Sequence, residues 1–251
     1  SWVINEKSHK YFHWYCDFLQ RLEYLAERNL LENQKTKPIL LSENYLNKNY
    51  IQTVLIDFEI PHIYLDKKKI YKIKNLDIPS HAAPSGNYDP QIINKISDNF
   101  KKKYLETKVF EKNKSHNRIW ISRNLAGKRH IKNMEEVSEI LNQFDFNIVD
   151  FQDMSIKDQV NLINKSDILG GIHGAGLTNM LFLEKGKSVI EVRGIGDQSN
   201  NCFFSLASEL SLDYYYFLAK VDDDDFYGSD YYIEPKSFNK FLSSVLKELN
   251  D

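Results

Sequence analysis

The sequence predicts an α/β fold whose C-terminal half is built on a parallel sheet. From residue 118 onward, short apolar runs alternate with amphipathic segments of helical length. One of these apolar runs leads directly into a glycine-rich turn. The composition, 42% hydrophobic and 27% charged, is typical of a globular protein with a buried core. Strands that alternate with helices in this way form parallel sheets through right-handed crossovers.

Size and charge exclude several classes of protein. The 251 residues suffice for one large domain or two modest ones. Lys and Arg number 33 against 35 Asp and Glu, so the net charge of -2 predicts no nucleic-acid partner. No run approaches the roughly 18 apolar residues of a membrane span, so we expect no transmembrane segment. Nothing in the sequence indicates an oligomeric state.

The cysteine and acidic residues predict neither a disulfide framework nor a metal site. Cys16 and Cys202 lie far apart and lack metal or redox spacing. We therefore expect a cytoplasmic protein, either whole or as a domain of a longer or membrane-associated one. Asp222–Asp225 point in different directions on any regular backbone, so we interpret them as a solvated loop. No metal and no cofactor are expected.

The first 89 residues predict a smaller α/β domain. Aromatic and aliphatic residues at helical spacing predict a helix from about residue 9 to residue 27. Extended runs at 38–41, 54–58 and 62–65 predict strands. The breaker-rich residues 78–86 predict a loop that marks the domain boundary. A charged helix, roughly 90–112, follows as part of a connecting segment over residues 90–117.

The predicted N-terminal helix carries a possible acid–base pair. His13 and Asp17 lie four residues apart and therefore share one helix face. An imidazole and a carboxylate at this spacing can form a general base with the group that orients it. A core histidine paired with its neighbour is the alternative interpretation.

Residues 118–220 predict the parallel-sheet domain, and residues 221–251 an acidic loop with a final helix. Asn133 with Glu136, and Ser155 with Asp158, are helix-start patterns of the capping-box kind. The expected strands are 118–122, 146–151, 168–172, 188–192 and 214–218. Helices are expected after Asn133, after Ser155, up to about residue 183, and over 202–210. The tail 235–249 predicts the last helix.

A glycine-rich run begins within the third expected strand of this domain and continues past its end. It reads Gly170-Gly171-Ile172-His173-Gly174-Ala175-Gly176-Leu177-Thr178-Asn179. Glycines at a strand end let the backbone approach a ligand, and the helix start beyond them attracts anions. A diphosphate suits this place, although the spacing is not that of a dinucleotide fingerprint. A tight turn with a structural histidine is the alternative.

Basic and acidic residues mark the ends of two strands of this domain. Arg123, Lys128 and Arg129 follow the first strand of this domain, where guanidinium groups match phosphate geometry. Glu191 ends the strand after the glycine run and can accept hydrogen bonds from ribose hydroxyls. The alternatives are solvated basic residues and an ion pair between Glu191 and Arg193 or another basic residue.

Several of these stretches together resemble glycosyltransferase family 61. The resemblance lies in the runs Ile121-Ser122-Arg123, Arg129-His130-Ile131-Lys132-Asn133 and His173-Gly174-Ala175-Gly176-Leu177-Thr178-Asn179, with Gln159 and Ile190-Glu191. The opening Tyr11-Phe12-His13-Trp14-Tyr15-Cys16-Asp17 is similar to the start of the family's domain. A departure is Met134, where the family commonly continues with Glu.

The resemblance implies a GT-B type architecture, with two Rossmann-like halves facing a cleft and the N-terminal half abbreviated. It implies an inverting, metal-independent transfer from a nucleotide-sugar donor, linked to UDP, to a hydroxyl of a glycan or glycoconjugate. Asp17 or His13 would be the base. The donor-binding residues implied are Arg123, Lys128, Arg129, His173, Gly174, Ala175, Gly176, Thr178, Asn179 and Glu191.

Two other functions are compatible with the same residues. A non-catalytic nucleotide- or glycan-binding module would retain the fold without the base. A hydrolase could use His173 as its base, although the sequence has no recognisable nucleophile motif.

Overall fold

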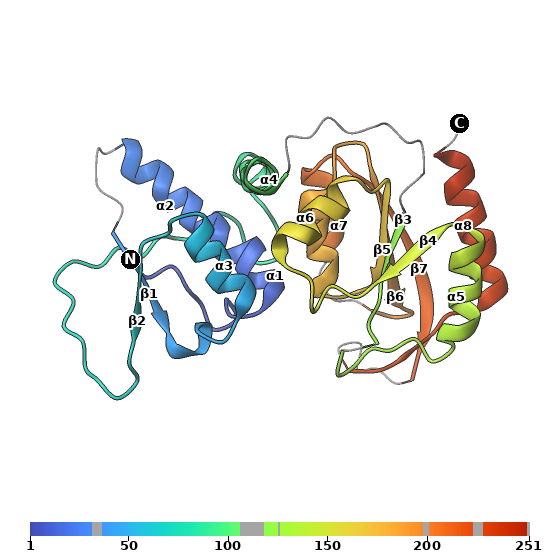
Figure 1. Cartoon of the computed structure of the whole chain (residues 1–251), viewed down its shortest axis with the longest axis horizontal. Coiled ribbons are helices and arrows are strands. Elements are labelled where there is room, and N and C mark those ends of the chain that lie inside the picture. Colours follow the sequence, from blue (N-terminus) through green and yellow to red (C-terminus); the bar gives the residue numbers. More distant parts are fainter. Residues whose placement is uncertain (32–36, 106–117, 125, 198–200, 223–227, 250–251) are drawn as a thin grey trace. The chain divides into compact units, whose positions relative to one another are not determined.

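The chain forms two compact units, residues 1–100 and 101–251, in a computed structural model that describes residues 1–31, 37–105, 118–124, 126–197, 201–222 and 228–249. The division falls within helix α4 (Pro90–Tyr104), which begins where the connecting helix was predicted to begin. The remainder of the predicted connector, 106–117, lies outside the described residues. Figure 1 shows the elements of both units.

The first unit opens with a nearly continuous helix, which confirms the prediction for residues 9–27. It consists of α1 (Tyr11–His13), the π-helical turn η1 (Trp14–Phe18) and α2 (Leu19–Leu31). All five residues of η1 are buried. Turns of π type inside a helix often occur at functional sites. Here the turn places the carboxylate of Asp17 in the interior of the unit.

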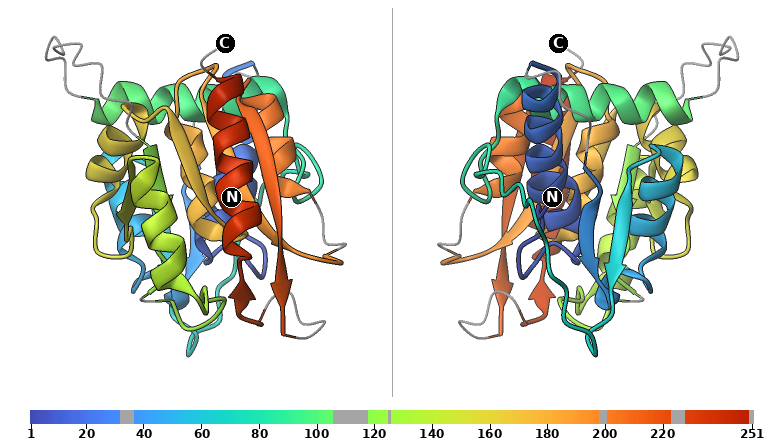
Figure 2. Two further views of the ribbon diagram at one scale, coloured as in Figure 1. Left: turned by 90° about the vertical axis from the view of Figure 1, so that its right-hand side faces the viewer. Right: turned by 90° about the vertical axis from the view of Figure 1, so that its left-hand side faces the viewer.

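A short parallel sheet and one further helix complete the first unit's regular structure. β1 (Ile39–Ser42) pairs with β2 (His62–Leu65), and α3 (Asn49–Asp57) connects them after the short helix η2 (Glu43–Tyr45). The right-hand view of Figure 2 shows these strands beside α3. Among the described residues this sheet has two strands.

The strand predicted at 54–58 is wrong, because residues 54–57 form the end of α3. Ile51, Val54 and Leu55 are all buried. This spacing is that of one helix face, so packing on that face overrides the strand preference of the β-branched residues. The predicted loop at 78–86 is confirmed, since it contains no helix or strand.

The described residues of the second unit form a six-stranded sheet, which confirms the parallel sheet predicted from residue 118. Its strands are β3 (Arg118–Ile121), β4 (Phe146–Val149), β5 (Ile168–Ile172), β6 (Ser188–Gly194), β7 (Asp213–Val221) and β8 (Tyr231–Tyr232). Their order is β4-β3-β5-β6-β7-β8, with only β8 antiparallel to its neighbour.

Helices cover both faces of this sheet. α5 (Met134–Gln143) and α8 (Pro235–Glu248) lie on one face, and α6 (Ile156–Asn164) and α7 (Cys202–Glu209) on the other (Figure 1). The left-hand view of Figure 2 shows α5 beside α8. The unit is therefore a doubly wound α/β fold. No described helix is long and apolar enough to cross a bilayer.

The strand order defines where a ligand should bind. β3 lies between β4, which follows it in the chain, and β5, which follows later. The order of the strands therefore reverses between β3 and β5. In open α/β sheets ligands bind outside the carboxyl ends of the strands at such a switch point. Arg123 and Arg129 follow β3, and the His173–Gly176 part of the glycine-rich run follows β5.

Gly170 and Gly171 allow β3 and β5 to pack closely. A Cβ atom on Gly170 would lie 2.7 Å from Cε3 of Trp120, and one on Gly171 would lie 3.1 Å from Cβ of Ile121. Trp120 is fully buried and makes edge contacts with Phe146 and Phe238. The paired glycines are therefore a packing requirement of the core.

The predicted capping residues have different outcomes. Ser155 caps α6 as expected, because its hydroxyl accepts a hydrogen bond from the amide of Asp158 at 3.1 Å. Asn133 precedes α5 but makes no capping bond. Its amide nitrogen donates to the carbonyl of Ile233 at 2.8 Å, and its oxygen accepts from the Ile233 amide at 3.2 Å. Asn133 thus joins the start of α5 to the end of β8.

Two other elements differ from the prediction. The helix after the glycine run is the 3-10 helix η3 (Ala175–Phe182), whose last six residues are all buried. A run buried on every side has no single apolar face, so packing determines its form. β6 continues to Gly194 alongside β7, so Glu191 lies inside the strand and not at its end.

Of the predicted acidic loop, Asp222 contacts Lys132, and residues 223–227 lie outside the described residues. The final helix is confirmed as α8.

Candidate functional site

Arg123 and Arg129 meet the glycine-rich loop at the switch point of the second unit. Arg123 follows β3, and Gly174 follows β5. A Cβ atom on Gly174 would lie only 2.6 Å from Nη1 of Arg123. Nη1 of Arg129 donates to the carbonyl of His173 at 2.8 Å. The structure therefore brings both predicted arginines against the predicted loop.

The connection between β3 and α5 folds back on itself to hold Arg123. Nε of Arg123 donates to the carbonyl of Arg129 at 3.1 Å, and Nη2 donates to the carbonyl of Lys128 at 2.9 Å. Arg129 adopts a left-handed backbone conformation with φ of 60°. This conformation is unfavourable for residues other than glycine and is often found at functional sites. The Lys128 side chain is exposed, and only its carbonyl contacts Arg123.

β8 supports this connection from a distant part of the sequence. The amide of Tyr231 donates to the carbonyl of His130, and the amide of Lys132 donates to the carbonyl of Tyr231, both at 2.8 Å. Together with the two Asn133 bonds to Ile233, these contacts fix the chain on the C-terminal side of Arg129.

The two guanidinium groups, of Arg123 and Arg129, form a cationic site without a direct ion pair to a described carboxylate. Nε of Arg129 is buried without a hydrogen-bond partner in that part of the chain. Burial, and then the charge of Arg129, lower the pKa of Arg123 to about 10. An anion bound here would favour the charged form of Arg123 and would accept a hydrogen bond from Nε of Arg129.

Backbone amides add to this anion site. η3 starts at Ala175, and the amide of Leu177 already donates to the carbonyl of Gly174 at 3.0 Å. The amides of Ala175 and Gly176 have no hydrogen-bond partner among the described residues. A pocket at this edge of the sheet is lined by Ile121, Ser122, Arg123, His130, Met134 and Ile172. The arrangement can bind a phosphate or diphosphate group.

His173 is held by a buried carboxylate. Its Nδ1 lies 2.5 Å from Oε1 of Glu191, and Tyr214 donates its hydroxyl to Oε2 of the same carboxylate. Glu191 is 1% exposed. Arg193 forms an ion pair with Asp197 at 3.0 Å. The proposed ribose contact of Glu191 stays a prediction.

Thr178 and Asn179 lie beneath the loop, each 1% exposed. Nδ2 of Asn179 donates to Oε1 of Gln159 at 3.0 Å, and Nε2 of Gln159 donates to the carbonyls of Phe151 and Met154. This buried chain of amides fixes η3 against the start of α6. The hydroxyl of Thr178 is buried with no hydrogen-bond partner in the described part of the chain.

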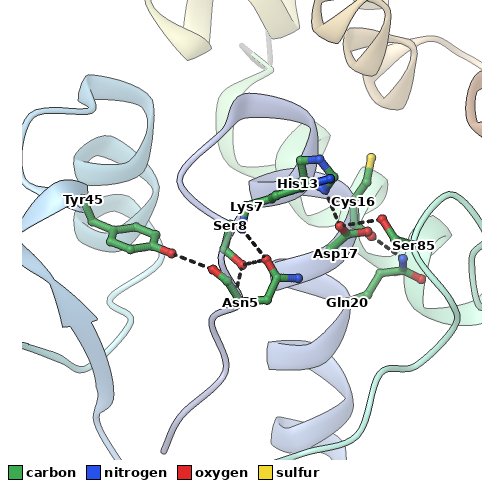
Figure 3. A network of polar contacts seen from close by, with 9 residues as sticks. All are labelled: Asn5, Lys7, Ser8, His13, Cys16, Asp17, Gln20, Tyr45 and Ser85. Carbon is green, nitrogen blue, oxygen red and sulfur yellow. Dashed lines mark hydrogen bonds and ion pairs between the residues drawn. The ribbon is translucent and has the colours of Figure 1, made fainter.

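In the first unit, His13 and Asp17 form the predicted pair. Nδ1 of His13 lies 2.6 Å from Oδ2 of Asp17, and the hydroxyl of Ser85 donates to the same oxygen at 3.0 Å (Figure 3). The Asp17 side chain is 3% exposed and that of His13 is 20% exposed. Nε2 of His13 has no hydrogen-bond partner among the described residues.

Ser85 and Tyr214 are site residues that the sequence analysis missed. Ser85 lies in the loop at 78–86, and Tyr214 near the start of β7. No local pattern connects Ser85 to Asp17 or Tyr214 to Glu191, since these contacts span 68 and 23 residues. Within the described ranges, no three His, Cys, Asp or Glu side chains are grouped so that they could hold a metal ion.

Comparison with protein families agrees with this arrangement. The family model described as Glycosyltransferase 61 matches residues 11–190, which include the His13–Asp17 pair, both arginines and the glycine-rich loop. The chain belongs to glycosyltransferase family 61. The resemblance noted from the motifs is thereby confirmed.

Curated relatives match over about a third of the chain. EGF domain-specific O-linked N-acetylglucosamine transferases are 36% identical in Bos taurus and 33% identical in Mus musculus, each over 84 residues. A beta-1,2-xylosyltransferase of Oryza sativa subsp. japonica is 31% identical over 93 residues. These alignments cover 32% to 36% of this chain and 16% of each relative.

Proposed function

We propose that the protein transfers a sugar from a UDP-linked donor to a hydroxyl group of a glycan or glycoconjugate, with inversion at the anomeric carbon. The observation that carries the proposal is the pair of guanidinium groups, without carboxylate partners among the described residues, beside the free amides of η3. Membership of family 61 supports glycosyl transfer as the reaction. The GT-B arrangement of two halves around a cleft and a cytoplasmic location are parts of the same proposal.

The charge of the departing UDP explains why two guanidinium groups lie at this site. As the bond between the anomeric carbon and the diphosphate oxygen breaks, negative charge accumulates on the departing UDP. Arg123, Arg129 and the amides of Ala175 and Gly176 would bind that charge as it develops. Donors held in place before the reaction stabilise such charge without reorganisation. These groups supply the role that a divalent metal plays in other transferases, which supports a metal-independent reaction.

The acceptor hydroxyl requires a base, and the geometry favours His13 over Asp17. The Asp17 carboxylate is almost fully buried and is already in contact with His13 and with the hydroxyl of Ser85. With the Nδ1 proton donated to Asp17, Nε2 of His13 is left as the accepting nitrogen. We propose that Nε2 takes the hydroxyl proton while the hydroxyl oxygen attacks the anomeric carbon opposite the diphosphate. Asp17 orients the ring.

The other predicted donor-binding residues divide into two groups. Gly174, Ala175 and Gly176 would contact the diphosphate through their backbone, and Lys128 would add an exposed charge nearby. Thr178 and Asn179 are buried and would support the loop without touching the donor. This division follows from their burial and from the bond between Asn179 and Gln159.

Calorimetry with UDP tests the donor site directly. Arg123→Ala should weaken UDP binding by about 1 kcal/mol or more, on the order of a charged hydrogen bond. Unchanged affinity would remove Arg123 from the site. Transfer is then measured with a panel of UDP-sugars, with and without glycan acceptors.

The same assays separate the alternative functions. A binding module would bind UDP-sugars without turnover, and His13→Ala would change nothing. A hydrolase would release free sugar in the absence of an acceptor.

A further inference from the structure

Glu191 has protein partners on both carboxylate oxygens. Oε1 contacts Nδ1 of His173 at 2.5 Å, and Oε2 accepts the hydroxyl hydrogen of Tyr214. The Glu191 side chain is 2% exposed. Burying a carboxylate is costly unless it is paired and hydrogen-bonded, and these two contacts provide that pairing.

Three neighbouring strands build this cluster. Glu191 of β6 pairs with Gly171 of β5 on one side and with Tyr216 of β7 on the other. Tyr214 lies two residues before Tyr216 and so presents its side chain on the same face of the sheet. The amide of His173 donates to the carbonyl of Val192 at 2.8 Å, which fixes the histidine backbone beside β6.

The imidazole of His173 is restrained by two contacts. Nδ1 is bound to Glu191, and the ring makes an edge contact with Phe203, at 5.2 Å between ring centres. The side chain is 12% exposed. Nε2 has no hydrogen-bond partner in the part of the chain that the structure describes. The carbonyl of the same residue accepts from Arg129, so this nitrogen belongs to a residue of the anion site.

We propose that Glu191 and Tyr214 are positioning residues, which hold His173 so that Nε2 donates a hydrogen bond to the diphosphate of the donor. The inference rests on the proposed function, since it assigns a role at the same site. In the complex the imidazole carries a proton on each nitrogen, one shared with Glu191 and one with a diphosphate oxygen. Glu191 then acts through His173 and does not contact the nucleoside.

Tyr214 is suited to this role. Burial, and then the charge of Glu191, raise the pKa of the Tyr214 hydroxyl. The hydroxyl therefore keeps its proton and remains a donor to Oε2. Without that donor, Glu191 would lose one of its two fixed contacts and the imidazole would be held less firmly.

Calorimetry with three ligands distinguishes positioning from ribose binding. Glu191→Gln should weaken UDP and 2′-deoxy-UDP by the same factor, about tenfold, and leave uridine unchanged, because a charge-assisted contact to the diphosphate is lost. Ribose binding predicts a loss for UDP and uridine and a smaller loss for 2′-deoxy-UDP, and that pattern would overturn the inference.

A double-mutant cycle tests whether Glu191 acts through His173. With His173→Ala as background, Glu191→Gln should cause no further loss of UDP affinity, because residues that act through one contact are not additive. A full additional loss would show an independent role and contradict the proposal. Tyr214→Phe should weaken UDP about threefold, by partial loss of the same support. Tyr215→Phe is the matched control, since its hydroxyl contacts Glu248 instead, and should leave affinity unchanged.

Nuclear magnetic resonance gives a reading that is independent of activity. The Nδ1 proton of His173 should appear far downfield in the unmodified chain and be lost in Glu191→Gln, with the thermal melt retained. If Glu191→Gln does not fold, Tyr214→Phe carries the test, and its downfield proton should shift. No UDP binding by the unmodified chain would refute the proposed function, whereas UDP binding that is unaffected by Glu191→Gln and Tyr214→Phe would refute this inference alone.

Discussion

The close approach of Gly174 to Arg123 makes one glycine a sensitive probe of the anion site. A methyl group at residue 174 would lie 2.6 Å from Nη1 of Arg123, so the guanidinium group must move. The backbone at Gly174 is extended, with φ of 169°, and alanine adopts this conformation without strain. Gly174→Ala therefore displaces a flexible side chain and leaves the backbone in place.

The magnitude follows from the contacts that Arg123 makes. Moving the guanidinium group breaks or lengthens its bonds to the carbonyls of Arg129 and Lys128, at 3.1 and 2.9 Å, and shifts its charge away from a bound diphosphate. Loss of one charged hydrogen bond costs about 1.5–3 kcal/mol, which corresponds to roughly 10- to 150-fold in UDP affinity. The melting temperature should change little, because no core group moves.

Calorimetry with UDP measures this effect, with two matched variants. Gly127→Ala lies in the same connection, where a Cβ atom meets nothing within 4 Å, and should bind UDP as the unmodified chain does. In the Arg123→Ala background, Gly174→Ala should have no further effect. UDP affinity within twofold of the unmodified value, or a full loss in the Arg123→Ala background, would refute the reasoning.

Three further outcomes are expected from the same architecture. His13→Ala should lower the transfer rate by about 10²- to 10⁴-fold, the usual contribution of a general base, while UDP affinity stays within about twofold; equal loss of binding would exclude His13 as the base. Transfer should be fully retained in excess chelator, and a strong loss rescued by manganese would contradict the metal-independent mechanism. Gly170→Ala should destabilise the fold by about 1–3 kcal/mol in a denaturant titration, since its methyl group would lie 2.7 Å from Trp120; an unchanged midpoint would mean that the core can expand there.

The sheet of the second unit could be predicted because its strands are separated by clear boundaries. Each apolar run from Arg118 onward ends at a glycine, a polar cluster or a capping residue such as Ser155. The strand predicted at 54–58 is wrong because Val54 and Leu55 continue, with Ile51, one buried face of α3. The period of a short apolar run does not by itself distinguish a helix from a strand. The burial of Ile51, Val54 and Leu55 on one face shows that this run is helical.

The positions of the site residues were predictable, but their partners were not. The carboxyl-end rule places Arg123 and His173 together without any knowledge of their side chains. Whether Glu191 faces a ligand or the interior depends on how far β6 continues beside β7, and on Tyr214. The choice between His13 and Asp17 depends on Ser85, which reaches the helix from the loop at 78–86. Such contacts depend on tertiary packing, and local spacing does not encode them.

The backbone bonds between β8 and residues 130–133 have a consequence for how the chain can be shortened. The range that matches family 61 ends at residue 190 and contains both arginines and the glycine-rich loop. A fragment cut to that range would nevertheless lack Tyr231 and Ile233, which secure the residues after Arg129. The proposed donor site therefore relies on a strand about one hundred residues downstream of the arginines whose connection it supports.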